Sequence, residues 1–237
     1  MCVDDIKLPN YKLRHELCNS ITHGLGAIFG ILATIFMYLK ICGVFPQSEV
    51  VYDIDFIYRC IGVGIYGFGM ITCMCISCLY HALARNKGKK VFRVIDHDFV
   101  FVLLAGTYSI YCLCAIRNTS IWNNLIPYSG WIIFAIVWVL VILGIIFNSI
   151  NIHKYSKLCM IIYIVAGWTI LFASDGIIKE VGINGFLLLL FGGIAYTIGA
   201  ILYGLGKKKS VWFHTVFHCF VIVGMILQFV SVYLYVL

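Results

Sequence analysis

Seven long apolar runs dominate this chain of 237 residues and leave few folds open to it. A run of about 20 apolar residues matches the thickness of a bilayer, and a helix satisfies all its backbone hydrogen bonds within lipid. The chain is 62% hydrophobic and only 11% charged, whereas soluble domains carry roughly 25% charged residues. Composition therefore excludes a soluble protein and indicates an integral membrane protein.

The predicted fold class is an all-α integral membrane protein, a seven-transmembrane helix bundle. The expected spans are 21–41, 57–80, 97–115, 129–148, 158–175, 185–205 and 211–236. The connections are short and polar, and none has the composition of a linker between domains. We therefore expect a short cytoplasmic N-terminal segment at 1–20 and a single seven-helix transmembrane domain at 21–237.

Basic residues predict the orientation. Most of the 17 lysines and arginines precede the first span or fill the second, fourth and sixth connections. These residues are Lys7, Lys12, Arg14, Arg85, Lys87, Lys89, Lys90, Arg93, Lys154, Lys157, Lys207, Lys208 and Lys209. The positive-inside rule then places the N-terminus in the cytoplasm and the C-terminus outside. The net charge of +7 lies mostly on these cytoplasmic segments, where it can meet anionic lipid head groups. No nucleic-acid partner is therefore expected.

Eleven cysteines occur in the chain, and most of them fall within the apolar spans. A free cysteine behaves as a small hydrophobic residue, so we expect buried thiols there. Cys42 and Cys60 flank the first outside connection and could pair in an oxidising compartment. The sequence leaves that pairing open.

Three histidines are expected at one depth near the cytoplasmic face. His214 and His218 are four residues apart at the start of the last span, and His81 ends the second span. Ser77 lies one turn before His81, and Asp96 stands at the start of the third span. Polar groups are costly in a bilayer, so their coincidence at one depth favours a functional site.

The histidines predict a Zn²⁺ site with His81, His214 and His218 as ligands. Three imidazoles and a water are an established catalytic zinc arrangement, and residues four apart on a helix have Cβ atoms about 5–6 Å apart. Zinc acidifies the water that it holds. Asp96 would accept or orient the proton, and Ser77 would hydrogen-bond the water or the substrate oxyanion. Taken singly, each histidine also fits an interfacial residue bonded to a carbonyl or water.

A second polar cluster lies at the first span. Glu16, Ser20 and His23 form a stripe on one helix face, with Asn19 beside it. We interpret Glu16, Asn19 and His23 as supporting residues around the metal site, with His23 as an alternative fourth ligand.

Three other features have simpler explanations. His97 and Asp98 flank Asp96, and the sequence favours Asp96 only weakly as the inward-facing group. His15 and His153 are interpreted as solvated loop residues. The glycines at 62, 64 and 67 match a nucleotide-binding pattern, but inside a span they indicate close helix packing.

Three stretches carry a resemblance to the hemolysin III family, within the broader progestin and adipoQ receptor (PAQR) group. They are ELCNSITHGLGA, SCLYHAL with VFRVIDHDFVFVLLAGTYS, and VWFHTVFHCF. The resemblance implies a seven-helix fold, zinc held by His81, His214 and His218, and ceramidase-like hydrolysis of lipid amides. It also implies that Asp96 and Ser77 contact the zinc-bound water. Asp98 is an extra acid where a small residue is expected, and the short N-terminus argues against hormone reception.

The leading functional hypothesis is a zinc-dependent lipid amide hydrolase in the plasma membrane or an internal membrane, acting on a ceramide-like substrate. One alternative is a non-enzymatic receptor or sensor with structural zinc. Another is a hemolysin-like membrane-permeabilising protein. The sequence does not give the oligomeric state.

Overall fold

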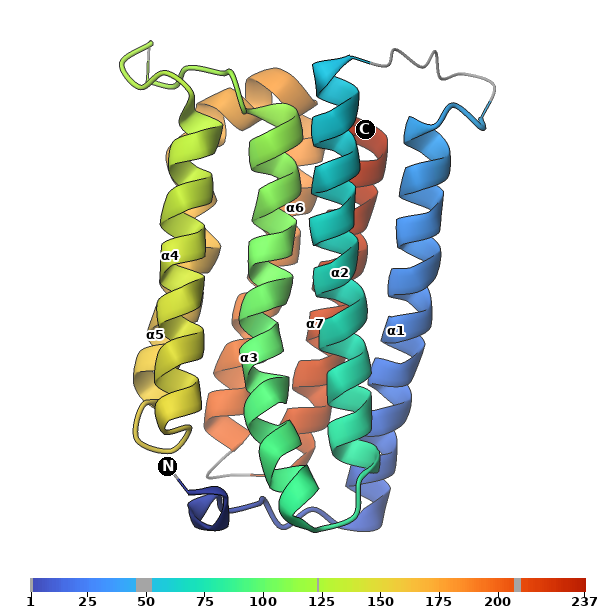
Figure 1. The fold of residues 1–237 in the computed structure, drawn as a ribbon, viewed down its shortest axis with the longest axis vertical. Helices are drawn as coiled ribbons and strands as arrows, with labels where there is room; N and C mark the ends of the chain where they lie inside the picture. The colour runs from blue at the N-terminus through green and yellow to red at the C-terminus, as the bar shows by residue number, and fades with distance from the viewer. Residues whose placement is uncertain (1, 46–52, 123, 207–209) are drawn as a thin grey trace.

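The computed structural model describes residues 2–45, 53–122, 124–206 and 210–237. Lys207, Lys208 and Lys209, which contributed to the predicted orientation, lie outside the described residues. The described chain is all-α, with helices packed side by side along the long axis of the molecule (Figure 1). The α-helices are α1 (Leu13–Ile41), α2 (Ile54–Ala82), α3 (Lys87–Ile110), α4 (Ser129–Ile150), α5 (Ser156–Trp168), α6 (Ser174–Gly206) and α7 (Trp212–Ser231).

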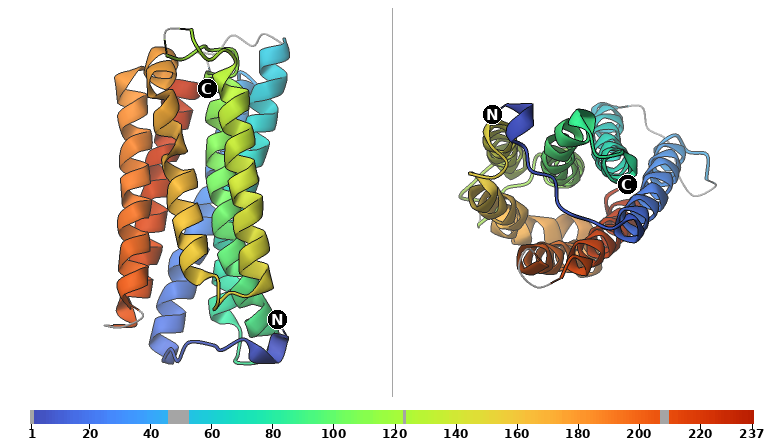
Figure 2. Two further views of the ribbon diagram at one scale, coloured as in Figure 1. Left: turned by 90° about the vertical axis from the view of Figure 1, so that its left-hand side faces the viewer. Right: turned by 90° about the horizontal axis from the view of Figure 1, so that it is seen from below.

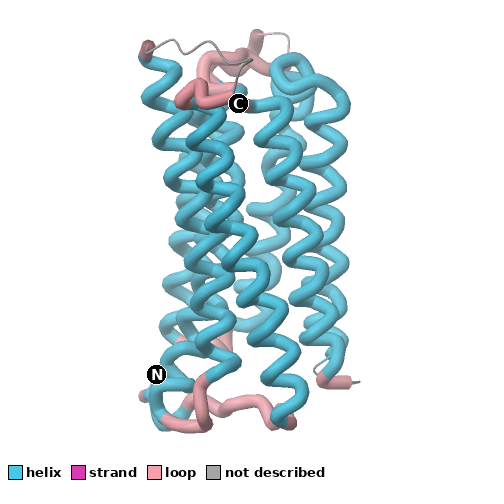
Figure 3. The backbone as a smooth tube through the Cα atoms, turned by 90° about the vertical axis from the view of Figure 1, so that its right-hand side faces the viewer, coloured by secondary structure: helices cyan, strands magenta, loops and turns pink. Residues whose placement is uncertain are grey.

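Four short helical segments complete the described part of the bundle. They are η1 (Val3–Asp5), η2 (Tyr111–Ala115), η3 (Thr169–Ala173) and η4 (Val232–Val236). Segments η2 and η4 prolong α3 and α7 directly, and η3 joins α5 to α6. Connections are confined to the two ends of the bundle (Figure 3). We call the end at which α1 begins and α2 ends the proximal end.

Length and composition identify an integral multi-pass membrane protein. Six continuous helical segments of the described chain are long and apolar enough to cross a bilayer. One of them, Ser156–Gly206, has 51 residues and contains α5, η3 and α6. Gly182 interrupts that segment with φ 71° and ψ 170°, a conformation that glycine adopts without steric cost. In the bundle, α5 and α6 run in opposite directions (Figure 2).

Three helices begin well before their expected spans, and one of them is α6, which starts at Ser174. α1 starts at Leu13, and α3 starts at Lys87 after Asn86, whose side-chain oxygen accepts a hydrogen bond from the Lys89 backbone at 2.8 Å. Lysine is a good helix former and asparagine a good N-cap, although neither raises hydropathy. Asp96, which we expect at the start of the third span, therefore lies in the third turn of α3.

The glycines of α2 serve close packing, as expected. A Cβ on Gly62 would lie 2.8 Å from Cys114 Sγ, and one on Gly67 would lie 2.5 Å from Thr34 Oγ1. Glycine therefore lets α2 approach η2 on one side and α1 on the other. All eleven cysteines are free thiols, Cys42 and Cys60 among them.

The segment before α1 crosses the proximal end of the bundle (Figure 2, right). Arg85 Nη1 donates to the carbonyl of Pro9 at 2.7 Å, and Arg93 donates to the carbonyl of Lys7. The Lys7 backbone in turn donates to His153 Nε2 at 3.1 Å. We call residues 7–11 the N-terminal strap. Its contacts hold it across the proximal end (Figure 2), where its residues line a cavity inside the bundle.

Candidate metal centre

Three buried imidazoles converge at the proximal end. His81 comes from the last turn of α2, and His214 and His218 come from successive turns of α7. The Nε2 atom of His214 lies 3.2 Å from Nε2 of His81 and 3.1 Å from Nε2 of His218. One nitrogen from each of the three residues lies within 4.8 Å of the others. The structure therefore brings together the three predicted metal ligands.

These separations fit a single metal ion. Zinc–nitrogen bonds of about 2.0–2.1 Å in tetrahedral geometry place ligand nitrogens about 3.3–3.4 Å apart. The Nδ1 atoms of His214 and His218 are buried, and the His218 ring faces the backbone of Asn19. Neutral imidazoles are suitable ligands for zinc and for several other divalent transition metals. The donor set is therefore compatible with zinc.

His81 is oriented by a carboxylate. Its Nδ1 atom lies 2.6 Å from Glu16 Oε2, on the opposite side of the ring from the other two histidines. Lys89 Nζ donates to Glu16 Oε1 at 2.7 Å, and Lys89 is itself buried. The sequence-based assignment of Lys89 to the second connection is thus wrong, because Lys89 lies in the first turn of α3. The one sequence feature near Lys89 that indicates a helix start is Asn86, the N-cap residue of α3.

The other predicted supporting residues lie between α1 and α7. The rings of His23 and His218 are stacked, with centroids 3.7 Å apart and planes 20° from parallel. Asn19 Oδ1 accepts a hydrogen bond from Thr215 Oγ1 at 2.7 Å. His23 therefore covers the face of His218, outside the converging group of three nitrogens.

The two histidines expected in solvated loops differ from each other. His15 is buried in the first turn of α1 and packs edge-on against Trp212 at 4.4 Å between ring centroids. That expectation is wrong for His15, because α1 begins before the apolar run. His153 is exposed, as expected.

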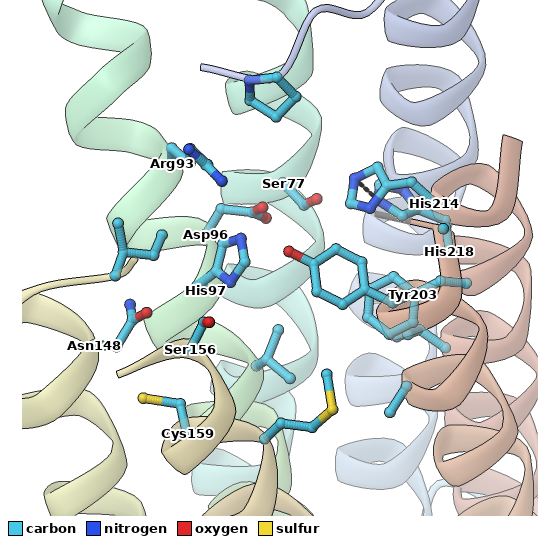
Figure 4. Close-up of a pocket in the computed structure, with 18 of the residues that line it drawn as sticks. Ser77, Arg93, Asp96, His97, Asn148, Ser156, Cys159, Tyr203, His214 and His218 are labelled. Atoms are coloured by element: carbon cyan, nitrogen blue, oxygen red, sulfur yellow. Dashed lines mark hydrogen bonds between the residues drawn. The ribbon is translucent and has the colours of Figure 1, made fainter. Parts of the chain in front are cut away.

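Asp96 and Ser77 are both buried and line the cavity beside the histidines of α7 (Figure 4). Arg93 and His97 belong to the same wall. Asp98 points elsewhere, because its carboxylate accepts hydrogen bonds from Asn148 Nδ2 at 2.8 Å and Ser149 Oγ at 2.9 Å. The extra acid therefore joins α3 to α4 and does not line the cavity.

The cavity has a volume of about 520 Å³, within the range of small-molecule sites. Ser77 and Asp96 lie on the side of the histidines, whereas Asn148 and Ser156 line the wall farther from them (Figure 4). The rest of the cavity wall includes the apolar side chains of Val100, Phe101, Met160, Phe217 and Val221. This lining suits an amphipathic ligand, with a polar group at the histidines and a hydrocarbon chain against the apolar wall.

The N-terminal strap lines the mouth of this cavity. Tyr11 stacks on His214, with ring centroids 5.4 Å apart and planes 13° from parallel. Burial, followed by the proximity of Tyr203, raises the pKa of Tyr11 above its ordinary value of 10.0. A neutral phenol ring therefore covers one face of His214. No feature of the sequence indicated this role for Tyr11.

The fold and the cluster define a class: a helical, multi-pass membrane protein with three convergent histidines inside its bundle. The chain belongs to the family of haemolysin-III related proteins, whose family model matches residues 11–229. The matched range contains every predicted site residue.

Two relatives extend this match over almost the whole chain. The chain is 33% identical over 225 residues to Hemolysin-3 of Bacillus cereus, covering 95% of this chain and 93% of that protein. It is 29% identical over 225 residues to the Hemolysin-3 homolog of Bacillus subtilis (strain 168), covering 95% and 96%. The resemblance inferred from the three motifs is confirmed.

Proposed function

We propose that this protein is a zinc-dependent hydrolase of membrane lipid amides, with a ceramide-like substrate. One observation carries the proposal. Three convergent imidazoles lie beside Asp96 and Ser77 on the wall of a cavity that is lined mainly by apolar side chains. Three histidines leave a coordination position open, which is typical of catalytic zinc sites, whereas structural sites are usually closed by four protein ligands.

The proposal includes seven membrane spans, a cytoplasmic N-terminus and an outside C-terminus. The opposite directions of α5 and α6 support counting the 51-residue segment as two spans. The basic residues around the proximal end support its cytoplasmic position. Cys2 and Cys42 are exposed near opposite ends of the bundle. In single-cysteine variants, an impermeant thiol reagent should label Cys42 from outside and Cys2 only after permeabilisation.

The residues have separate parts in the proposed reaction. A bound zinc ion would polarise the amide carbonyl and lower the pKa of water toward about 7. Asp96 accepts the proton of the attacking water and transfers it to the leaving amine nitrogen as the C–N bond breaks. Ser77 Oγ donates a hydrogen bond to the substrate oxygen. The products are a fatty acid and an amine.

The apolar wall and the strap would bind and shield the substrate. Val100, Phe101 and Phe217 offer an apolar surface to the acyl chain. Tyr11 and its neighbours in the strap cover the mouth, which limits the access of water to the reacting groups.

Turnover by the purified protein tests this proposal. In detergent, wild type should release fatty acid from a short-chain ceramide, lose activity on chelation and regain it on zinc addition. Asp96→Asn should keep the metal and lose turnover. Zinc-loaded wild type without lipid-amide turnover would contradict the hydrolase and leave a receptor with structural zinc.

Membrane permeabilisation is the second candidate, because both relatives are named as hemolysins. It makes a different prediction, since a pore does not need the metal ligands. Dye leakage from liposomes that persists in His218→Ala would favour permeabilisation over hydrolysis.

A further inference from the structure

The three histidines are held in different ways. The Nδ1 atom of His81 has a charged hydrogen-bond partner, the Glu16 carboxylate at 2.6 Å. The Nδ1 atoms of His214 and His218 are buried with no such partner in the described part of the chain. Their rings stack instead against Tyr11 and His23. A substitution at Glu16 therefore acts on His81 directly and leaves both stacking contacts in place.

Lys89 fixes the carboxylate that holds His81. An ammonium group has three donors, and Lys89 Nζ has three acceptors within reach. They are Glu16 Oε1 at 2.7 Å, the Leu83 carbonyl at 2.9 Å and the His81 carbonyl at 3.4 Å. Each of α1, α2 and α3 thus contributes to one hydrogen-bonded group. The two oxygens of Glu16 are divided between Lys89 and His81, which leaves the carboxylate little freedom to rotate.

We propose that Glu16 and Lys89 are positioning residues that fix the tautomer and ring orientation of His81. Glu16 accepts the Nδ1 hydrogen, so that the Nε2 lone pair points toward His214 and His218. Carboxylate–histidine pairs have this effect in metal sites, where they fix the ligand ring and raise its basicity. The inference rests on the metal site of the proposed function and assigns the first supporting layer of that site.

Stability alone does not account for this arrangement. Lys89 is only 2% exposed, and a buried ion pair often contributes no more than well-packed apolar residues, because desolvation offsets the attraction. A purely structural pair could therefore be replaced by neutral side chains of similar shape without consequence for the metal. A positioning pair could not be replaced in this way without weakening metal binding.

Metal affinity measured on folded, purified protein separates these roles. Zinc binding is followed by competition with a chromophoric chelator, and the visible spectrum of the Co²⁺-substituted protein reports ligand geometry. Glu16→Ala should weaken zinc binding about 10–100-fold and alter the Co²⁺ bands. Glu16→Gln should also weaken zinc binding, because its single amide oxygen cannot accept hydrogen bonds from both Lys89 and His81.

A double variant controls for the destabilising effect of leaving one buried charge without its partner. Glu16→Gln combined with Lys89→Met leaves no unpaired charge buried and frees the amide oxygen for His81, so it should bind zinc more tightly than Glu16→Gln alone but more weakly than wild type. The matched controls are Glu180→Gln, which affects an exposed carboxylate bonded to Thr119, and Lys87→Met on the exposed start of α3. Both should bind zinc as wild type does.

Failure of the positioning role can be distinguished from failure of the metal site. If wild type binds zinc and folded Glu16→Ala binds it equally well, even with a lower melting temperature, the positioning role is overturned and the metal site stands. If wild type binds neither zinc nor Co²⁺, the metal site itself is overturned, and the positioning role with it.

Discussion

Asn148 donates a hydrogen bond of 2.8 Å from Nδ2 to Asp98 Oδ1 and so joins α4 to α3. Asp96 lies two residues earlier on α3, which rotates its side chain by about 200° relative to Asp98. Asp96 consequently lines the cavity, while Asp98 lies against α4. Two neighbouring acids of the same helix thus belong to different parts of the molecule.

Exchanging each acid for its amide should separate these roles. Asp98→Asn should lower stability by about 1 kcal/mol or less, because one of its hydrogen bonds to α4 is retained, and should leave zinc content and turnover unchanged. Asp96→Asn should abolish turnover with zinc retained. Melting temperature, metal content and fatty-acid release are measured on both. Loss of turnover in a folded Asp98→Asn protein would contradict the assignment.

Tyr11 should govern how quickly the metal leaves. Its ring covers His214 at the cavity mouth, so Tyr11→Ala should increase the rate at which a chelator extracts zinc. Tyr11→Phe should behave as wild type, because the stacked ring is kept. Tyr128→Ala, at an exposed tyrosine before α4, serves as the control. Equal extraction rates in wild type and Tyr11→Ala would show that the strap does not cover the site.

Two glycines should respond in opposite ways to alanine. A Cβ on Gly130 would meet backbone atoms, with Ile116 O at 2.7 Å and Arg117 Cα at 2.8 Å, whereas one on Gly193 would meet nothing within 4 Å. Gly130→Ala should therefore destabilise by about 1–3 kcal/mol. Gly193→Ala should stabilise α6 by up to about 1 kcal/mol. Thermal melting in one detergent checks both, and a stable Gly130→Ala protein would contradict the packing at α4.

The convergence of the three histidines could be predicted from sequence because its signals are local. Spacing of four residues places His214 and His218 on one helix face, and the end of an apolar run fixes the depth of His81. Loop charge then assigns both helix ends to the same side of the membrane.

The surroundings of the cluster depend on helix packing and could not be predicted in the same way. Lys89 has a strongly polar local sequence, yet it is buried because α1, α2 and α3 meet around it. Choosing between Asp96 and Asp98 required the position of α4. The early starts of α1 and α3 could not be predicted from hydropathy, because polar residues can form a helix outside the apolar run.

Metal analysis of purified protein tests the central claim most directly. Wild type should carry about one zinc ion per chain, as expected for a single three-histidine site. His81→Ala, His214→Ala and His218→Ala should each lose it, while His153→Ala, at an exposed histidine, should retain it. Stoichiometric zinc in all three cluster variants, or none in correctly folded wild type after zinc addition, would contradict the account.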